Sequence, residues 1–500
     1  MWVAAALTAA AMFVTRKLRR DGARRPAAGG TPVLLLAACG VAVAQTIVLA
    51  ALTVFAGELD VSATGATWLL TAFMLASAVA TPVAGRLGDQ FGHRRVLLIG
   101  LALLLAGSVV AAVSTSLGSY PGVLTGRVLQ GLSGGVFPCA FGLARQTVPA
   151  ERLGGVVAAL SAMFGFGGAL GMVAAGPLVD VTGPASLFWL VAVLALLALA
   201  GVVRVPSPVT SAARPGRVDL AGAVLLTGAL VALLLAVSQG RAWGWSSPGI
   251  LTLFVAAVVF AAAFGLVERR VAAPLVDLRL LVGPRLLTTN IATLVVAVGM
   301  FAAVTLLPLF VQTPTTLGYG FGYSPAQTGL VMVPMAVCML IAAPLAARIT
   351  RSLGAKAAFR AGAVLAAVAL GGLGVSHEHI AELLIWCALL GLAYGLAFAS
   401  LGGLVVGAIG QEATGAATGI NTILRTVGGA VGSVLAAVIV SSAAVPGQPP
   451  AEWGYTAAFV VSGAIALCAA AVTATRRAGD AQPGRRTRRR SAAQPENDRL

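Results

Sequence analysis

The feature that most constrains this chain is a succession of about fourteen apolar stretches of transmembrane length between Pro32 and Thr475. A helix needs about 20 apolar residues to cross the hydrocarbon core of a bilayer, and it satisfies its own backbone hydrogen bonds there. Only 10% of the residues are charged and the mean hydropathy is +0.96, whereas an average soluble protein has about 25% charged residues. The chain is therefore predicted to be an all-α integral membrane protein of about fourteen transmembrane helices.

The positive charges lie in alternate loops between these stretches. The net charge of +17 would suit a nucleic-acid partner, but this alternation indicates orientation in a membrane instead. The basic loops hold Arg86, Arg94, Arg95, Arg145, Arg152, Arg204, Arg214, Arg217, Arg269, Arg270, Arg279, Arg285, Arg348, Arg351, Lys356 and Arg360. The opposite loops hold Glu58, Asp60, Asp180, His377, Glu378, His379 and Glu452, with Arg241 as a basic exception. We expect a multi-pass protein of the cytoplasmic membrane with both termini in the cytoplasm and no nucleic-acid partner.

The first fourteen residues form a short apolar segment before a basic run that starts at Arg16. At ~1.5 Å per residue they reach about 21 Å, short of a bilayer, and a signal peptide has its positive region first. An interfacial anchor, a marginal extra span and an over-long start remain open, and we favour a segment that is not needed for activity. Residues 1–31 are expected to be a cytoplasmic basic segment, and residues 476–500 a disordered basic tail.

Catalytic, metal and nucleotide sites are not indicated. The cysteines show no paired or metal-like spacing and are expected to be reduced core residues: Cys39, Cys139, Cys338, Cys387 and Cys468. A phosphate-binding G-x-x-x-x-G-K-[ST] loop needs a lysine, and the chain has only Lys17 and Lys356, so it has no ATPase of its own. The histidines lie in loops and no carboxylate lies near the middle of a predicted span. We therefore expect that the protein is not an enzyme and that it binds no cofactor and no metal.

One short polar segment, Gly85-Arg86-Leu87-Gly88-Asp89-Gln90-Phe91-Gly92-His93-Arg94-Arg95, lies between the second and third stretches. It resembles the G-x-L-a-D-x-x-G-R-[RK]-x signature of the major facilitator superfamily of transporters, and His93 is the only obvious departure. In that fold Asp89 would face a helix N-terminus and pair with a loop arginine, which would latch the cytoplasmic side. Glycines 85 and 92 would allow tight turns and close helix approach. The predicted latch comprises Gly85, Asp89, Gly92, Arg94 and Arg95.

The chain also aligns with itself. The signature matches a degenerate copy from Ala347 to Lys356 at an offset of 262 residues, and residues 166–171 match residues 427–432 at 261. Such an offset exceeds six spans with short loops, and the stretches 220–237 and 250–267 supply two additional helices. We predict a major facilitator fold with six-helix bundles at 32–204 and 286–475, and two inserted helices and a cytoplasmic loop at 205–285.

This arrangement resembles the fourteen-helix drug:proton antiporters of that superfamily. The likeness includes the loop Pro274-Leu275-Val276-Asp277-Leu278-Arg279 and continues to Gly419–Gly429, so that it covers residues 32–475. It implies a monomeric secondary active transporter that exports drugs, antibiotics or other amphipathic small molecules by alternating access in exchange for protons. An ion-uncoupled facilitator and a metabolite transporter of the same fold are the alternatives.

Two arginines fall inside predicted spans, where a guanidinium is costly and usually functional. Arg127, followed by Gln130, lies in a stretch that resembles the superfamily's l-x-x-x-R-x-x-q-G motif, whose arginine is linked to proton transfer or to the central cavity. Arg425 is aligned by the internal repeat with Phe164, so this basic site belongs to one half only. It either lines the cavity or binds a backbone carbonyl.

Two departures from the family weaken the assignment of proton exchange. The family's first span shows L-D-x-T-I-V, whereas this chain has Ala44 at the aspartate position, and the fifth span lacks the proline of the antiporter motif. Proton coupling needs a titratable group that is alternately exposed. In this chain, proton coupling would use a carboxylate at a helix end, namely Glu58, Asp219 or Glu382, or it would use Arg127 with a partner. The third alternative is that proton coupling is absent.

The same lack of deep carboxylates bears on the substrate. An interior that offers only positive side chains favours neutral or anionic amphipathic compounds over dications. The expected polar contacts in an otherwise apolar cavity are Gln45, Thr46, Asn290, Gln312, Asn421 and Thr422. Small residues that allow close helix packing are expected at Gly167, Gly168, Gly171, Gly428, Gly429 and Gly432.

Overall fold

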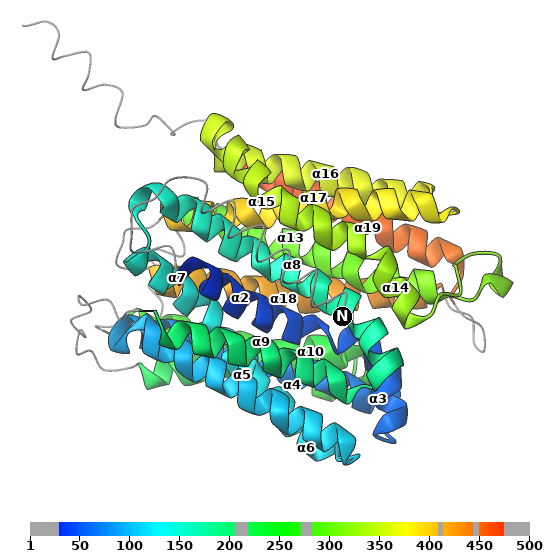
Figure 1. The fold of residues 1–500 in the computed structure, drawn as a ribbon, viewed down its shortest axis with the longest axis horizontal. Helices are drawn as coiled ribbons and strands as arrows, with labels where there is room; N and C mark the ends of the chain where they lie inside the picture. Colours follow the sequence, from blue (N-terminus) through cyan, green and yellow to red (C-terminus); the bar gives the residue numbers. More distant parts are fainter. Residues whose placement is uncertain (1–29, 206–218, 272–282, 409–413, 444–449, 475–500) are drawn as a thin grey trace, which may run out of the picture.

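The computed structural model describes residues 30–205, 219–271, 283–408, 414–443 and 450–474 (Figure 1). Every regular element in these ranges is a helix. Twelve of the described helices are long and apolar enough to cross a membrane. The prediction of an all-α, multi-pass membrane protein is thereby confirmed. The expectations for residues 1–29, for the loop 274–279 and for residues 476–500 lie outside the described residues.

The chain forms two helical halves with a hairpin between them (Figure 1). The first half comprises α2 (Gly30–Thr46), η1 (Leu49–Ala51), α3 (Leu52–Glu58), α4 (Ala63–Phe91), α5 (His93–Ser116), α6 (Tyr120–Gly131), η2 (Leu132–Gly135), α7 (Val136–Thr147), α8 (Ala150–Thr182) and α9 (Ala185–Val203). The hairpin is α10 (Leu220–Trp243) and α11 (Pro248–Glu268). The second half comprises α13 (Pro284–Gln312), η3 (Thr315–Leu317), α14 (Pro325–Val331), α15 (Val333–Leu353), α16 (Ala355–Val375), α17 (Ile380–Ala408), α18 (Thr414–Ser442) and α19 (Glu452–Ala474).

Two predicted spans are interrupted rather than continuous. The first stretch stops as an α-helix at Thr46 and resumes as α3 after the turn η1, and the fourth is divided into α6 and α7 by η2. The second break falls on the run Leu132-Ser133-Gly134-Gly135. There the chain lies close against α4, since an added Cβ on Gly134 would meet the Ser77 hydroxyl. Neither interrupted stretch is among the twelve long apolar helices.

The signature segment is mostly helix and not the loop that its composition indicates. Helix α4 runs through Gly85 and Asp89 to Phe91, and α5 begins at His93. Gly92 alone makes the junction, with φ of 97° and ψ of 126°, a conformation that glycine adopts at no steric cost. Gly85 therefore makes no turn. Gly354 joins α15 to α16 in the same way, with φ of 88° and ψ of 159°.

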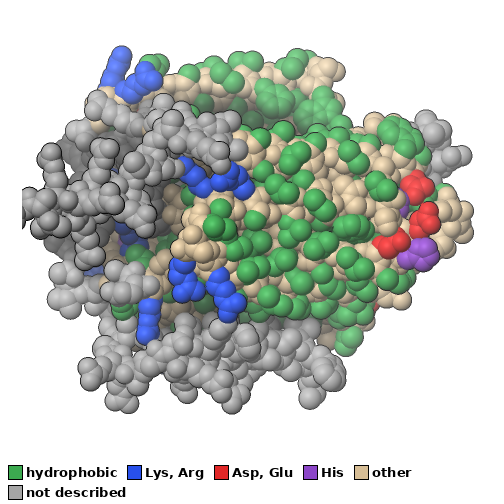
Figure 2. Space-filling view, turned by 90° about the horizontal axis from the view of Figure 1, so that it is seen from above, with side chains coloured by type: hydrophobic (Ala, Val, Ile, Leu, Met, Phe, Trp, Pro, Cys, Tyr) green, Lys and Arg blue, Asp and Glu red, His purple; other side chains and the backbone are tan. Residues whose placement is uncertain are grey.

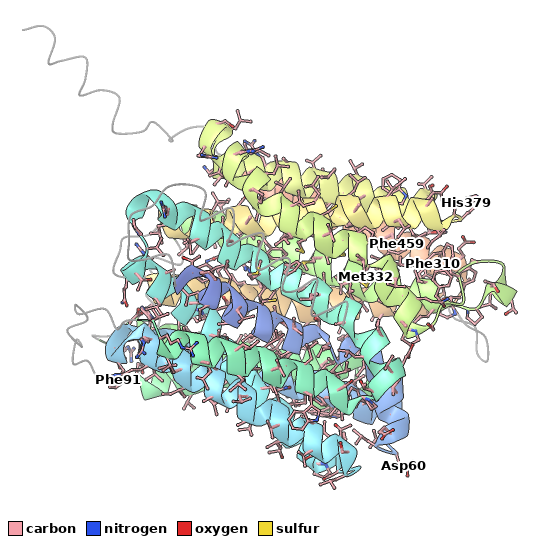
Figure 3. All side chains as sticks on the ribbon, in the orientation of Figure 1. Asp60, Phe91, Phe310, Met332, His379 and Phe459 are labelled. Carbon is pink, nitrogen blue, oxygen red and sulfur yellow. The ribbon has the colours of Figure 1, made fainter. Side chains whose placement is uncertain are left out.

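The charged side chains seen on the surface in Figure 2 gather at two ends of the molecule. Figure 2 shows arginine and lysine at one end and acidic side chains and histidine at the other. Figure 3 places Phe91 at the first end, and Asp60 and His379 at the second. We call these the basic end and the acidic end. The alternation predicted from the sequence is thus a property of the folded chain, although the Arg241 side chain is not among those described.

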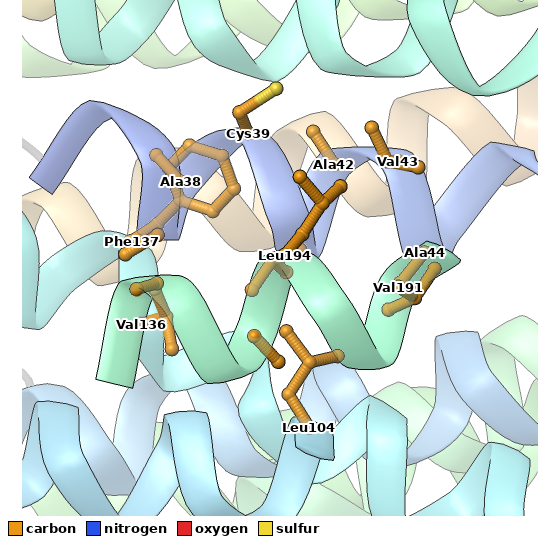
Figure 4. Close-up of a cluster of buried hydrophobic side chains, with 14 of the residues drawn as sticks. Ala38, Cys39, Ala42, Val43, Ala44, Leu104, Val136, Phe137, Val191 and Leu194 are labelled. Carbon is orange, nitrogen blue, oxygen red and sulfur yellow. The ribbon is translucent and has the colours of Figure 1, made fainter. Parts of the chain in front are cut away.

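Small residues set the helix packing inside the first half. Helix α2 presents Ala38, Cys39 and Ala42 to its neighbours, with Leu194 of α9 and Leu104 of α5 against its other side (Figure 4). An added Cβ on Gly167 of α8 would lie 2.6 Å from the Ala42 Cβ. In a membrane, where lipid is as apolar as leucine, such close approach supplies most of the attraction between helices.

The other glycines predicted for packing lie at equivalent contacts. Gly171 faces Thr46 of α2, and Gly428 and Gly432 of α18 approach the backbone of α13 at Leu294 and Val298. Gly168 and Gly429 stand next to Thr46 and Phe301. One core prediction is wrong: Cys468 is exposed on α19, because this helix turns one face away from the second half.

The halves meet along two seams. On one, Ala78 of α4 and Ile423 and Ala430 of α18 share a cluster with Leu230 and Leu234 of α10, so that the hairpin covers the seam. On the other, α8 packs against α14, α15 and α17.

Candidate functional site

Arg425 of α18 lies buried in the middle of the molecule with 2% of its surface exposed. Its guanidinium carbon is 5.4 Å from the ring centre of Phe164 on α8 and 5.0 Å from that of Phe398 on α17. Both distances are within the range of cation–π attraction. Phe137 and Phe301 extend this aromatic group, with ring centres 5.3 and 6.3 Å from Phe164. Side chains of both halves therefore enclose one cation.

The internal repeat shows why this place is central. Arg425 and Phe164 occupy equivalent positions in the two halves, 261 residues apart, and Phe398 and Phe137 have the same spacing. Equivalent positions of two symmetry-related units contact each other only near the axis that relates them. The contact of Arg425 with Phe164 thus places both side chains close to the pseudo-twofold axis between the halves. The sequence alignment paired these positions without indicating that they touch.

The Arg425 guanidinium has neither an ion pair nor a hydrogen bond within the described residues. Its Nε is buried without a hydrogen-bond partner, and its contacts there are the two phenylalanine rings. Of the two roles left open for Arg425, binding a backbone carbonyl is therefore wrong within these ranges. The side chain lies at the interface of the halves, where a central cavity is expected.

Arg127 of α6 is also fully buried, but it is held by hydrogen bonds. Its Nε donates to the Leu69 carbonyl at 2.8 Å, and its Nη1 donates to the Ala44 carbonyl at 2.9 Å and to Gln130 Oε1 at 2.7 Å. The Phe73 ring lies 4.5 Å from the guanidinium carbon, and Gln130 continues to the Ser108 hydroxyl at 2.8 Å.

The contact with Ala44 explains the break in the first span. Ala44 lies in the last turn of α2, where carbonyl groups have no partner within the helix. A cation there satisfies the carbonyl and is favoured by the helix dipole. Arg127 therefore caps α2 at the position where the family has an aspartate, and it does so through the backbone of Ala44.

Asp89 pairs with His93 and not with an arginine. Asp89 Oδ1 is 3.3 Å from His93 Nε2, one helical turn further along the chain. The histidine ring fits between two glycines, since an added Cβ on Gly88 or Gly142 would come within 2.5 Å of it. Arg94 instead donates to the Val203 carbonyl at 2.7 Å, and Arg95 is exposed. Within the described ranges the expected arginine partner of Asp89 is therefore wrong, because the histidine that departs from the family signature takes that place.

Two carboxylates converge at the base of the hairpin. Asp219 caps α10 by accepting from Gly222 N at 2.8 Å. An added Cβ on Gly222 would lie 2.3 Å from Asp219 Oδ2 and 2.9 Å from Glu268 Oε1. Both carboxylates are buried, and close to them along α10 and α11, Ala223 and Phe264 pack with Val83 of α4 and Ile420 of α18. Sequence analysis named Asp219 but missed Glu268 as its neighbour, because α11 returns to α10 only in the fold.

The remaining predicted site residues have different surroundings. Thr46 donates to the Gly168 carbonyl at 2.7 Å and Asn421 to the Thr293 hydroxyl at 2.7 Å, so both join helices. Asn290 is buried with both amide atoms unpartnered, and Gln45 and Thr422 are also buried. Gln312 and Glu58 are exposed at the ends of their helices. Gln312 is therefore not a cavity residue in this conformation.

The halves are in contact at both ends of the α8 seam. Toward the acidic end, an added Cβ on Gly176 would lie 2.4 Å from the Pro325 carbonyl oxygen of α14. Toward the basic end, an added Cβ on Gly402 of α17 would lie 2.0 Å from the Ser161 hydroxyl of α8. Arg425 is therefore enclosed from both directions, and access to it requires one of these contacts to separate.

A comparison with protein families identifies this architecture. The model of the major facilitator superfamily matches residues 34–314 and again residues 289–497. The chain belongs to the major facilitator superfamily. Membership places it among transporters rather than enzymes. The two matches also reflect the repeat of the two halves.

Relatives of this major facilitator include antibiotic and multidrug export proteins. It is 29% identical over 392 residues to the tetracenomycin C resistance and export protein of Streptomyces glaucescens, over 77% of this chain and 71% of that protein. It is 31% identical over 310 residues to a probable actinorhodin transporter of Streptomyces coelicolor, over 60% of this chain and 52% of that protein. The multidrug transporter MdtP of Bacillus subtilis is 27% identical over 292 residues, 58% of this chain and 52% of MdtP. The chain thus spans about half of the last two proteins.

Solved structures share the fold of this major facilitator. The human organic anion transporter MFSD10 has a TM-score of 0.63 and 17% identity, over 90% of this chain and 100% of that chain. The proton:xylose symporter XylE has a TM-score of 0.58 and 17% identity, over 89% and 94%. At these identities the likeness shows the fold alone.

Proposed function

We propose that this protein is a secondary transporter that exports amphipathic small molecules, of the antibiotic or drug type, by alternating access. The observation that carries the proposal is the buried Arg425 between Phe164 and Phe398, on the axis between the halves. A site on that axis is reached from either side when the halves rock. The export relatives support the direction and the class of substrate.

The proposed topology has fourteen crossings. The twelve long helices would be completed by α2 with η1 and α3, and by α6 with η2 and α7, because each interrupted group continues in one direction through the first half. Residues 32–204 and 286–475 would form the two bundles and residues 205–285 the inserted segment. The basic end would face the cytoplasm with both termini, since basic loops remain on that side.

Asp89, with His93, Gly92, Arg94 and Arg95, would stabilise the conformation that is closed at the basic end. The contact of Asp89 with His93 joins the end of α4 to the start of α5. It also braces both helices against α7, where the histidine ring contacts Gly142. Rocking of the first half would move these helices together.

Coupling to protons would use Asp219 and Glu268. Both are buried titratable groups, and proton coupling needs a titratable group that is alternately exposed. Ala223 and Phe264, close to the pair along α10 and α11, pack with Val83 of α4 and Ile420 of α18. Relative movement of α4 and α18 would therefore change the access of the pair to water. Glu58 is exposed, which favours the pair.

A facilitator without ion coupling is the second candidate. The observation in its favour is Arg127, which donates to carbonyl and amide oxygens and to no carboxylate among the described residues. A proton-linked switch at this arginine would lack its acidic partner. Both candidates share the same central site and differ only in what drives the cycle.

The test uses proteoliposomes with a pH-sensitive dye inside and an imposed proton gradient. Antiport predicts that a transported compound changes the internal pH at a rate that depends on the protein. Facilitation predicts counterflow of the compound with no change in internal pH. Absence of both counterflow and pH change for a panel of neutral and anionic aromatic compounds would refute the proposed export.

A further inference from the structure

We propose that Arg425 is the anion-binding group of the central site, and that the site takes an organic monoanion with an aromatic body. This inference rests on the proposed transport function, and it names the substrate class of that site. The geometry that carries the inference is a guanidinium whose contacts among the described side chains are two aromatic faces, one from each half.

A buried cation without a counter-ion is an unusual arrangement. Moving a charged group out of water costs several kcal/mol, and proteins normally compensate it with a carboxylate or with a full set of hydrogen bonds. Arg127 is compensated in large part, with three hydrogen bonds and one ring, and of its donor atoms only Nη2 is buried without a partner among the described residues. Arg425 has two rings, and its buried Nε has no partner. The unused donors of Arg425 are therefore free for an oxyanion of a ligand.

The surroundings of Arg425 specify the rest of the ligand. Phe164 and Phe398 flank the guanidinium, and Phe301 and Phe137 lie beyond Phe164. Methionines also reach this place, since Met339 and Met300 lie beside Gly165, next to Phe164. Aromatic rings favour stacked or edge contacts with other rings, and methionine adapts its shape to a ligand. These residues suit a flat apolar body.

The charge of the ligand follows from the number of available cations. Among the described side chains of the central region, Arg127 is occupied by the end of α2, so Arg425 is the cation that remains without a hydrogen bond. A single guanidinium binds one sulfonate or carboxylate through charge-assisted hydrogen bonds. We therefore expect a monoanion to bind better than its neutral isostere and much better than a cation.

The experiment measures binding to the purified full chain in detergent by isothermal titration calorimetry. The probes are pyrenesulfonate, the neutral pyrenesulfonamide and a pyrene that carries a trimethylammonium group, which differ mainly in charge. We expect the sulfonate to bind about tenfold to a hundredfold more tightly than the sulfonamide, the range of one hydrogen bond to a charged group. Arg425→Gln should remove this preference. Arg360→Gln, at an exposed arginine of α16, should keep it.

The comparison of sulfonate with sulfonamide on the wild-type protein tests the anion site without any variant. If Arg425→Gln does not purify, Arg425→Met provides an apolar replacement. Equal affinity for the two probes, or a preference that persists without Arg425, overturns the anion site. Counterflow in proteoliposomes separates the two proposals. If binding depends on Arg425 but no counterflow occurs, export is refuted and the anion site is retained. If the sulfonamide shows counterflow and the sulfonate is not preferred, export is retained and the anion site is refuted.

Discussion

The two buried arginines should respond in opposite ways to the same substitution. Methionine has a similar length and no charge, so Arg127→Met and Arg425→Met remove the guanidinium while they retain most of the apolar side chain. In the first variant, the Ala44 carbonyl and Gln130 Oε1 lose their donor. The Leu69 carbonyl also loses the Arg127 donor, but it lies inside α4 and keeps its hydrogen bond within the helix. In the second variant, no acceptor among the described residues loses a hydrogen bond, because Arg425 contacts two rings there.

The magnitudes follow from these contacts. A buried acceptor without a donor costs about 1–3 kcal/mol, so two of them make Arg127→Met destabilising by about 2–6 kcal/mol. For Arg425→Met, two lost cation–π contacts cost about 0.5–2 kcal/mol each. The relief of a desolvation penalty of several kcal/mol offsets this loss. The second variant should therefore be as stable as the wild type or more stable.

The assay is thermal unfolding in one detergent, followed by intrinsic fluorescence and by the monodisperse fraction in size-exclusion chromatography. We expect the unfolding temperature to fall by several degrees for Arg127→Met and to remain equal or rise for Arg425→Met. Equal losses in the two variants would refute the assignment of Arg127 as a cap of α2 and of Arg425 as an uncompensated charge. Arg360→Met serves as the control for removal of an exposed arginine.

Further predictions concern the latch, the glycine junction and the carboxylate pair. Asp89→Asn removes the charge that pairs with His93, and we expect a folded protein with slowed transport in vesicles of known protein content; a wild-type rate would contradict the latch. Gly354→Ala places a side chain on a residue with a φ of 88°, and it should lower the free energy of unfolding by about 1–3 kcal/mol. The matched control is Gly371→Ala, in the interior of α16 with open space around it, which should be neutral or mildly stabilising. Asp219→Asn keeps a side-chain oxygen for the cap of α10 but removes a titratable group. It should leave folding intact and abolish substrate-induced pH change, and unaltered proton movement would exclude Asp219 as the coupling group.

Sequence patterns were sufficient for the features that depend on repeated local chemistry. Apolar length predicted the spans, and the alternation of charge predicted the two ends. The offset of 262 residues relates Pro82 of α4 to Pro344 of α15, and Gly92 to Gly354, which make the same kind of junction. Each of these features is encoded within a few neighbouring residues or by their repetition.

Features that depend on contacts between distant segments were not predicted. The sequence contains His93, but its partnership with Asp89 depends on the space that Gly142 of α7 leaves beside α4. The nearness of Glu268 to Asp219 depends on the return of α11 to α10. The polar loop around Asp89 was misplaced because glycine and charge are typical of turns, whereas here the helix extends beyond the apolar stretch.

The contact of Arg425 with Phe164 lies between these cases. The repeat placed the two residues at equivalent positions, and symmetry adds that equivalent residues on an axis touch. The sequence alone does not tell which equivalent pairs lie on that axis.

The central claim, that the two halves rock about Arg425, is tested most directly by opposing substitutions on the α8 seam. Gly176→Ala adds a side chain against the backbone of Pro325 and Ala326, and Gly402→Val adds a larger one against Ser161 and Val157. Each should separate the halves at one end. The distances are measured by pulsed electron spin resonance between labelled cysteines in a chain that lacks its native cysteines.

The reporter pairs lie on opposite halves, at positions that the structure exposes. Phe91 and Leu353 report on the basic end, and Thr182 and Gln312 on the acidic end. The account predicts that Gly176→Ala lengthens the Thr182–Gln312 distance without lengthening the Phe91–Leu353 distance, and that Gly402→Val has the reverse effect. Unchanged distances in both variants, or lengthening at both ends in each variant, would contradict the rocking of two halves about a central site.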